Sequence, residues 1–122
     1  MTQVNWVLAT AAEYNIPVKF VVLNNSALGS MVGVQENAFD GRVLCTRFTD
    51  HSSGEPYVQD FSLLAKSYNV KSSRITEPSD IKPAINVMMS EDGPYLLEIM
   101  SELHASPEGA GTMWVSEKSW QQ

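Results

Sequence analysis

Apolar positions recur along the chain with two different periods, which predict an alternation of helices and strands. Apolar residues at helical spacing predict three helices, over residues 2–15, 60–70 and 78–93. Short apolar or β-branched runs predict three strands, over residues 18–23, 70–76 and 94–100. A further short helix is expected within residues 26–39, weakened by its glycines, and residues 40–58 are expected to be irregular.

Polar residues at the ends of these segments predict where the helices begin and end. Thr2 can cap the first helix, and Asp60 can cap the second by accepting hydrogen bonds from its first turn. Asn69 stands where a residue of left-handed conformation ends a helix. Ser79 or Asp80 is expected to cap the third helix.

This order of elements predicts the α/β class, with a mostly parallel sheet between layers of helices. The strand at residues 18–23 is the most apolar, so we expect it to be central. Three strands are few for such a three-layer α/β/α fold, so the fold is expected to be truncated. Residues 1–100 are expected to form a partial domain, and residues 101–122 a tail that docks through its tryptophans.

Composition narrows the function classes. The net charge is −6, and the eight basic residues are scattered, which argues against nucleic acid and against a polybasic membrane contact. No apolar run approaches the roughly 20 residues that span a bilayer. A single cysteine, Cys45, cannot form an internal disulfide and favours a cytoplasmic location.

Two asparagines, Asn24 and Asn25, end the apolar strand at residues 18–23. In open α/β sheets, ligands bind beyond the carboxyl ends of the strands. The amide oxygen of asparagine is a neutral, hard donor that suits Mg²⁺ or Ca²⁺. Asparagine also satisfies turn geometry well, so the residues alone leave a metal site and a turn as alternatives.

The stretches "ATAAEYNIPVKFVVLNNSALG", "DFSLLAKSYNV" and "GPYLLEIM" resemble the C-terminal, diphosphate-binding domain of thiamine diphosphate enzymes, especially the acetolactate synthase group. In that family a Gly-Asp-Gly motif opens a segment that closes with Asn-Asn. The acid, the second asparagine and a main-chain carbonyl two residues later bind Mg²⁺, which holds the diphosphate. The resemblance therefore implies thiamine diphosphate and Mg²⁺ as cofactors, and 2-oxo acids as substrates of the parent enzyme.

Carried over by position, the resemblance makes Asn25 a metal ligand through its side chain and Ala27 a ligand through its carbonyl. Leu28, Gly29, Ser30 and Met31 would lie along the cofactor, and a glycine there lets backbone approach a phosphate. Ser30 departs from the family, which often has a large apolar side chain at this position. No catalytic residue is assigned within the chain.

The resemblance also indicates what this sequence does not contain. It holds no Gly-Asp-Gly, and the family spacing would put the aspartate ahead of Met1. In the family, a separate pyrimidine-binding domain contributes the glutamate that activates the cofactor. We therefore expect the isolated chain to be inactive, with a pyrimidine-binding domain or further copies of itself as partners.

Three other functions remain as alternatives. The chain could be a non-catalytic, oligomeric interaction module derived from the same fold. A flavodoxin-like phosphate binder would need a better glycine-rich loop than "NNSALGSMVG". A hydrolase triad is disfavoured because Asp50, His51 and Ser52 are consecutive, and consecutive side chains rarely converge on one atom.

Overall fold

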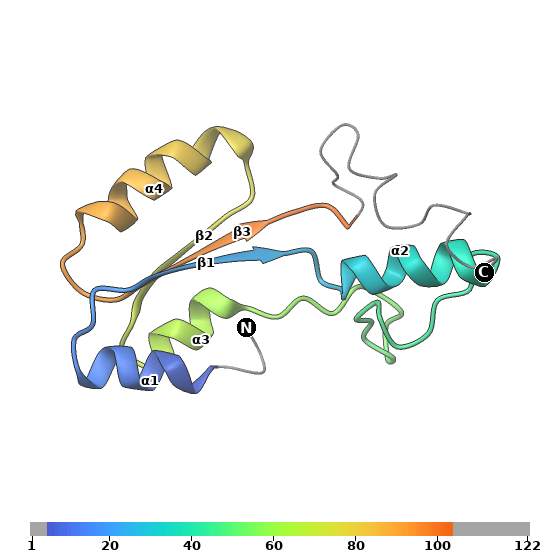
Figure 1. Ribbon diagram of the computed structural model, residues 1–122, viewed down its shortest axis with the longest axis horizontal. Helices are drawn as coiled ribbons and strands as arrows, with labels where there is room; N and C mark the ends of the chain where they lie inside the picture. The colour runs from blue at the N-terminus through green and yellow to red at the C-terminus, as the bar shows by residue number, and fades with distance from the viewer. Residues whose placement is uncertain (1–4, 104–122) are drawn as a thin grey trace, which may run out of the picture. The chain divides into compact units, whose positions relative to one another are not determined.

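A three-stranded parallel sheet organises much of the chain in the computed structural model, which describes residues 5–103 (Figure 1). In chain order the elements are α1 (Trp6–Glu13), β1 (Lys19–Asn24), α2 (Gly29–Ala38), α3 (Phe61–Ser67), β2 (Lys71–Ile75), the 3₁₀ turn η1 (Pro78–Asp80), α4 (Ile81–Ser90) and β3 (Tyr95–Met100). The predicted α/β class with a parallel sheet is confirmed.

The described residues divide into two compact units. The first unit contains residues 5–24 and 58–101, and so holds the whole sheet together with α1, α3 and α4. The second unit contains residues 25–57, 102 and 103, and holds α2. The chain passes from the first unit to the second between Asn24 and Asn25.

The strand order is β1-β3-β2, so the expectation that residues 18–23 form the central strand is wrong. The central strand is β3, whose residues Tyr95 to Glu98 are all buried. β1 pairs only with β3 among the described strands, and its Val21 and Leu23 side chains are 52% and 69% exposed. Apolar composition marked β1 as a strand but did not determine its neighbours, because strand order is set by contacts distant in sequence.

Both faces of the sheet carry helices (Figure 1). On one face, Leu8 of α1 and Ala65 of α3 pack with Leu96 of the central strand. On the other face, Met88 of α4 packs with Leu97 of the same strand. Successive residues of a strand point to opposite faces, so β3 contributes to both apolar clusters.

The predicted helix ends are confirmed where a local signal is strong. The Asp60 carboxylate accepts a hydrogen bond of 2.6 Å from the Leu63 backbone N–H, and Asn69 has a left-handed φ of 59°. Asp80 stands at the N-cap of α4 but forms no side-chain cap, because η1 precedes it. Thr2 lies outside the described residues.

In the second unit, α2 forms where the short helix was expected. The following segment is irregular as predicted, apart from two isolated antiparallel bridges, which pair Ala27 with Arg47 and Thr49 with Pro56. Within residues 5–103, no helix has the length and apolar character needed to cross a bilayer.

Candidate functional site

The two consecutive asparagines at the end of β1 make different contacts. Asn24 is buried, and its amide nitrogen donates to the Glu98 carboxylate at 2.7 Å and to the Gln59 carbonyl at 3.0 Å. Asn25 uses its side-chain oxygen to accept from the Ala27 N–H at 3.2 Å. Asn24 is therefore a structural anchor, whereas the side chain of Asn25 belongs to the loop that follows.

Glu98 is a fully buried acid in the central strand, and sequence reasoning did not single it out. Its second carboxylate oxygen accepts from the Ser62 backbone N–H at 3.0 Å and lies 3.8 Å from the Arg74 guanidinium. The first turn of α3 and the strands on both sides of β3 are thereby tied to one carboxylate. Burying a carboxylate is tolerated when it is paired and hydrogen-bonded in this way. The detectable signal was a single acid inside the apolar run "PYLLEIM".

Asn25 and Ala27, the predicted metal ligands, lie on one edge of a short antiparallel ladder. The Leu28 N–H donates to the Thr46 carbonyl at 2.8 Å, and the Phe48 N–H donates to the Ser26 carbonyl at 3.2 Å. These bonds flank the Ala27–Arg47 bridge, so Ala27 is in a non-hydrogen-bonded pair. The N–H and carbonyl of Ala27 therefore both point away from the partner segment. The Asn25 oxygen that accepts from this N–H lies on the same edge.

The other predicted cofactor-binding residues lie where α2 begins. Leu28 is its N-cap position, and Gly29, Ser30 and Met31 form its first turn. Among the described residues no side chain caps the helix, and because the Met31 N–H donates to the Leu28 carbonyl, the N–H groups of Gly29 and Ser30 are the donors that can face an anionic group. A Cβ at Gly29 would lie 2.5 Å from the amide nitrogen of Asn25, so a larger residue there would displace the Asn25 side chain.

Asn25 and Ala27 also line a hollow of about 340 Å³ within the second unit. Arg47 lines this hollow as well, and its guanidinium is paired with Glu36 of α2. No carboxylate is among the described residues that line it. Across residues 5–103, no group of three or more His, Cys, Asp or Glu side chains is arranged to hold a metal ion.

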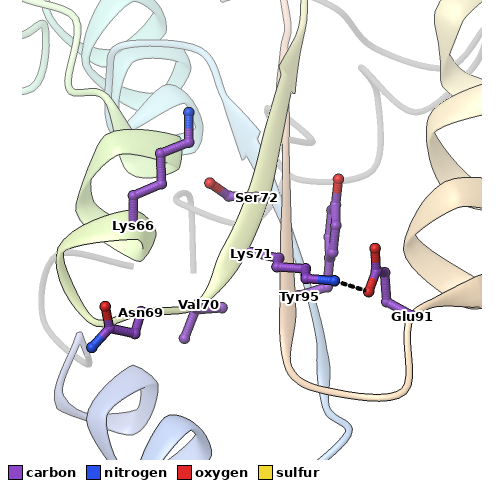
Figure 2. Close-up of a pocket in the computed structure, with 7 residues that line it drawn as sticks. All are labelled: Lys66, Asn69, Val70, Lys71, Ser72, Glu91 and Tyr95. Atoms are coloured by element: carbon purple, nitrogen blue, oxygen red, sulfur yellow. Dashed lines mark hydrogen bonds and ion pairs between the residues drawn. The ribbon is translucent and has the colours of Figure 1, made fainter.

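A second, larger hollow of about 450 Å³ lies at the amino ends of β2 and β3 (Figure 2). Lys66 and Lys71 border it, but Lys71 is paired with Glu91 at 2.5 Å. The hydrogen bond to Glu91 raises the pKa of Lys71 above its ordinary value. The carboxyl end of α3, the negative end of its dipole, also faces this hollow. These features disfavour an anion, so the candidate site remains the loop after β1.

Comparison with known protein families identifies the chain. Residues 1–99 match the family described as "Thiamine pyrophosphate enzyme, C-terminal TPP binding domain". The chain belongs to this family. The predicted resemblance is confirmed, and the loop at Asn25 occupies part of a thiamine-pyrophosphate-binding domain.

Similar proteins include large subunits of acetolactate synthases. The chain is 39% identical over 107 residues to a probable acetolactate synthase large subunit of Methanococcus aeolicus, with 84% of this chain and 17% of that protein covered. It is 31% identical over 116 residues to the isozyme 2 large subunit of Escherichia coli strain K12, covering 91% of this chain and 20% of that protein. The chain thus spans a fifth or less of these relatives.

A solved structure supports the same fold. The thiamine diphosphate-dependent 4-hydroxybenzoylformate decarboxylase of Rhodococcus jostii RHA1 superposes with a TM-score of 0.68 at 26% sequence identity. The superposition covers 80% of this chain and 17% of the decarboxylase. The α/β arrangement is therefore that of a thiamine diphosphate enzyme domain.

The loop after β1 fits one part of a Mg²⁺–diphosphate group. The Asn25 side-chain oxygen and the Ala27 carbonyl are neutral oxygen donors on one edge, as Mg²⁺ accepts. The missing Cβ at Gly29 and the uncapped start of α2 suit the approach of a phosphate. The charged donor that Mg²⁺ usually takes is not among the described residues lining the hollow.

Proposed function

We propose that the chain is the Mg²⁺- and diphosphate-binding part of an acetolactate synthase-like carboligase or decarboxylase that acts on 2-oxo acids. The observation that carries this proposal is the shared orientation of Asn25 and Ala27 in a member of the thiamine-pyrophosphate-binding family. These two oxygen donors are two residues apart and lie on the same edge of the antiparallel ladder. They provide the neutral ligands of a magnesium site.

Each residue of the loop has a role in this proposal. Asn25 and Ala27 bind the metal through the side-chain oxygen and the main-chain carbonyl. Leu28 to Met31 lie along the diphosphate, whose negative charge the first turn of α2 stabilises. The bound cofactor supplies an electron sink for carbanion chemistry on a 2-oxo acid.

We further propose that this chain alone is not catalytic. Two neutral oxygens leave most of the charge of Mg²⁺ uncompensated, and the chain spans a fifth or less of its acetolactate synthase relatives. Damage around a metal site typically weakens metal affinity by about 10- to 100-fold, and loss of a carboxylate ligand is a larger defect. A pyrimidine-binding domain would be the partner that completes an active site.

A titration of the full chain with thiamine diphosphate and Mg²⁺, monitored by calorimetry and by backbone NMR, tests the proposal. Weak binding, with a Kd of about 1 mM or above, is expected to shift the resonances of Asn25 and Ala27. Asn25→Ala should abolish the shifts, whereas Asn37→Ala, on the exposed side of the same unit, should retain them.

Two outcomes would contradict the proposal in different ways. If no resonance of the loop responds at about ten times that concentration, the loop does not bind the cofactor. If the Kd is far below 1 mM, the neutral donors suffice and the expected inactivity loses its basis.

A second candidate function is a non-catalytic interaction module that forms oligomers. It is favoured by the two exposed apolar side chains of β1, Val21 and Leu23, on a strand with one described neighbour. A parallel sheet is normally covered, and an exposed strand edge promotes association with another chain.

A further inference from the structure

The position of the Ala27 carbonyl depends on the segment that pairs with it. The backbone bonds from Leu28 to Thr46 and from Phe48 to Ser26 hold Ala27 between them. They turn its carbonyl outward only while Thr46 to Phe48 keep their place. This pairing is a single isolated bridge, and its Phe48 end is also held by the Tyr57 N–H, which donates to the Phe48 carbonyl at 2.9 Å beside the Thr49–Pro56 bridge. The Thr46 end is supported from α2.

The side chain of Gln35, on α2, provides that support. Its amide oxygen accepts from the Leu44 N–H at 3.2 Å and from the Thr46 hydroxyl at 2.7 Å. Its amide nitrogen donates to the Leu44 carbonyl at 3.1 Å. The Gln35 amide thus bonds both the N–H and the carbonyl of Leu44, as the backbone of a neighbouring strand would. It also holds the buried Thr46.

Local strain indicates that the segment needs this support. Cys45, between the two residues that Gln35 holds, has a left-handed φ of 60°. This conformation is unfavourable for a residue with a Cβ and persists where the surroundings impose it. The three hydrogen bonds of Gln35 act on the residues on both sides of Cys45. They are contacts that can help to impose the turn.

The geometry points to Gln35 as a positioning residue for the Ala27 carbonyl, acting through Thr46. The importance of that carbonyl rests on the proposed function, whereas the positioning itself does not. The route is short: α2 carries Gln35, Gln35 holds Thr46, and the Thr46 carbonyl accepts from the N–H of the residue after Ala27. Because α2 begins at Gly29, the same helix presents its first turn to the cofactor and fixes the carbonyl beside it.

The adjacent residue on α2 offers a natural comparison. Glu36 pairs with Arg47, so it also links α2 to the segment opposite Ala27. Both of these side chains are partly exposed, and ion pairs of this kind hold geometry weakly. We therefore assign the positioning to Gln35 and treat Glu36 as a control.

The test uses the full chain, labelled for NMR, with amide hydrogen exchange of Leu28 and Phe48 as the first measurement. Gln35→Ala keeps a good helix former in α2 but removes all three hydrogen bonds. It should lower the protection of both amides by about tenfold or more, with Val32 in α2 unaffected. Glu36→Gln should change none of the three amides. Thr46→Val should lose part of the protection of these amides, whereas Thr46→Ser, which keeps the hydroxyl, should keep the protection of the parent chain.

The second measurement is the response of the Ala27 carbonyl resonance to Mg²⁺ and thiamine diphosphate. In Gln35→Ala this response should weaken about tenfold, whereas Glu36→Gln should behave as the parent chain. If the parent chain shows no response but Gln35→Ala still deprotects Leu28, the positioning stands and the proposed cofactor function fails. If Leu28 stays protected in both Gln35→Ala and Thr46→Val, Gln35 does not position Ala27 and the inference is overturned.

Discussion

Asn24 and Asn25 have the same side chain, yet their environments give them different tasks. Asn24 is held by the buried Glu98, and Asn25 contributes to the loop that carries the candidate metal ligands. The residue types alone could not separate these tasks, because either asparagine satisfies a turn and either could bind a cation, and Asn25 was singled out by family resemblance. The difference arises from Glu98, which is 74 residues away along the chain.

Replacing Glu98 tests its anchoring role. Glu98→Ala removes the buried carboxylate that the Asn24 amide, the Ser62 N–H and the Arg74 guanidinium share. We expect the free energy of unfolding to fall by about 3 kcal/mol, the cost of breaking a buried charged network. Glu77→Ala removes an exposed acid of the same unit and should cost less than about 0.5 kcal/mol. Urea denaturation measures both, and equal losses would contradict the anchoring role.

Asp50 provides a pH-dependent test in the second unit. The Ser52 hydroxyl and N–H donate to its carboxylate at 2.6 and 2.8 Å, and they lower the pKa of Asp50 below 3.8. Because the pKa of Asp50 is lower in the folded than in the unfolded state, its ionised carboxylate stabilises the fold at pH values above the unfolded-state pKa. This contribution to the free energy of unfolding is lost as the pH falls through the folded-state pKa.

Carboxyl ¹³C titration by NMR measures this pKa directly. Ser52→Ala should raise the pKa of Asp50 towards 3.8, because the largest cause of the shift is the Ser52 hydroxyl. Ser53→Ala keeps its backbone N–H and should leave the pKa nearly unchanged. If the pKa of Asp50 is the same in the parent chain, in Ser52→Ala and in Ser53→Ala, the Ser52 hydroxyl does not bind the Asp50 carboxylate.

Elements with local signals were predicted well, and features set by distant contacts were not. The Asp60 cap and the left-handed Asn69 follow from side-chain chemistry within α3, so the sequence sufficed. The central place of β3 depends on pairing with strands far away in sequence, and apolar content alone favoured β1 instead. Gln35 carried no sequence signal, because its partners lie in an irregular segment. Asn25 and Ala27 were named from family resemblance, and their ligand roles stay predictions.

Two glycines of α2 allow a matched test of its first turn. A Cβ on Gly33 meets nothing within 4 Å, so Gly33→Ala should stabilise the chain by up to about 1 kcal/mol. A Cβ on Gly29 would displace the Asn25 amide. Gly29→Ala should therefore gain less stability and move the Asn25 side-chain resonances. Thermal denaturation and NMR measure the two effects, and unchanged Asn25 resonances in Gly29→Ala would contradict the close approach.

At the scale of the whole molecule, the edge strand β1, which has one neighbour among the described strands, matters most. The curated relatives extend well beyond the matched segment, which covers a fifth or less of their length. Val21 and Leu23 give β1 an exposed apolar surface beside its one described neighbour. We expect this surface to be covered by association, either with another copy or with a pyrimidine-binding domain.

Light scattering coupled to gel filtration tests self-association. Leu23→Lys should shift the chain towards monomer without unfolding it, because the side chain is already largely exposed and a lysine blunts a strand edge. Leu63→Lys, an equally drastic change on the exposed side of α3, should leave the oligomer intact. A parent chain that stays monomeric at high concentration would contradict this expectation.

The exposed Cys45 gives the second unit a built-in attachment point for a spectroscopic label. It is the single cysteine of the chain, so a thiol-reactive fluorophore would modify one position without any prior mutagenesis. Its neighbours Leu44 and Thr46 are the residues held by Gln35, and Thr46 in turn contacts the loop of Ala27. A dye at Cys45 would therefore report movements of that loop in real time, and would make stopped-flow measurements of cofactor association accessible.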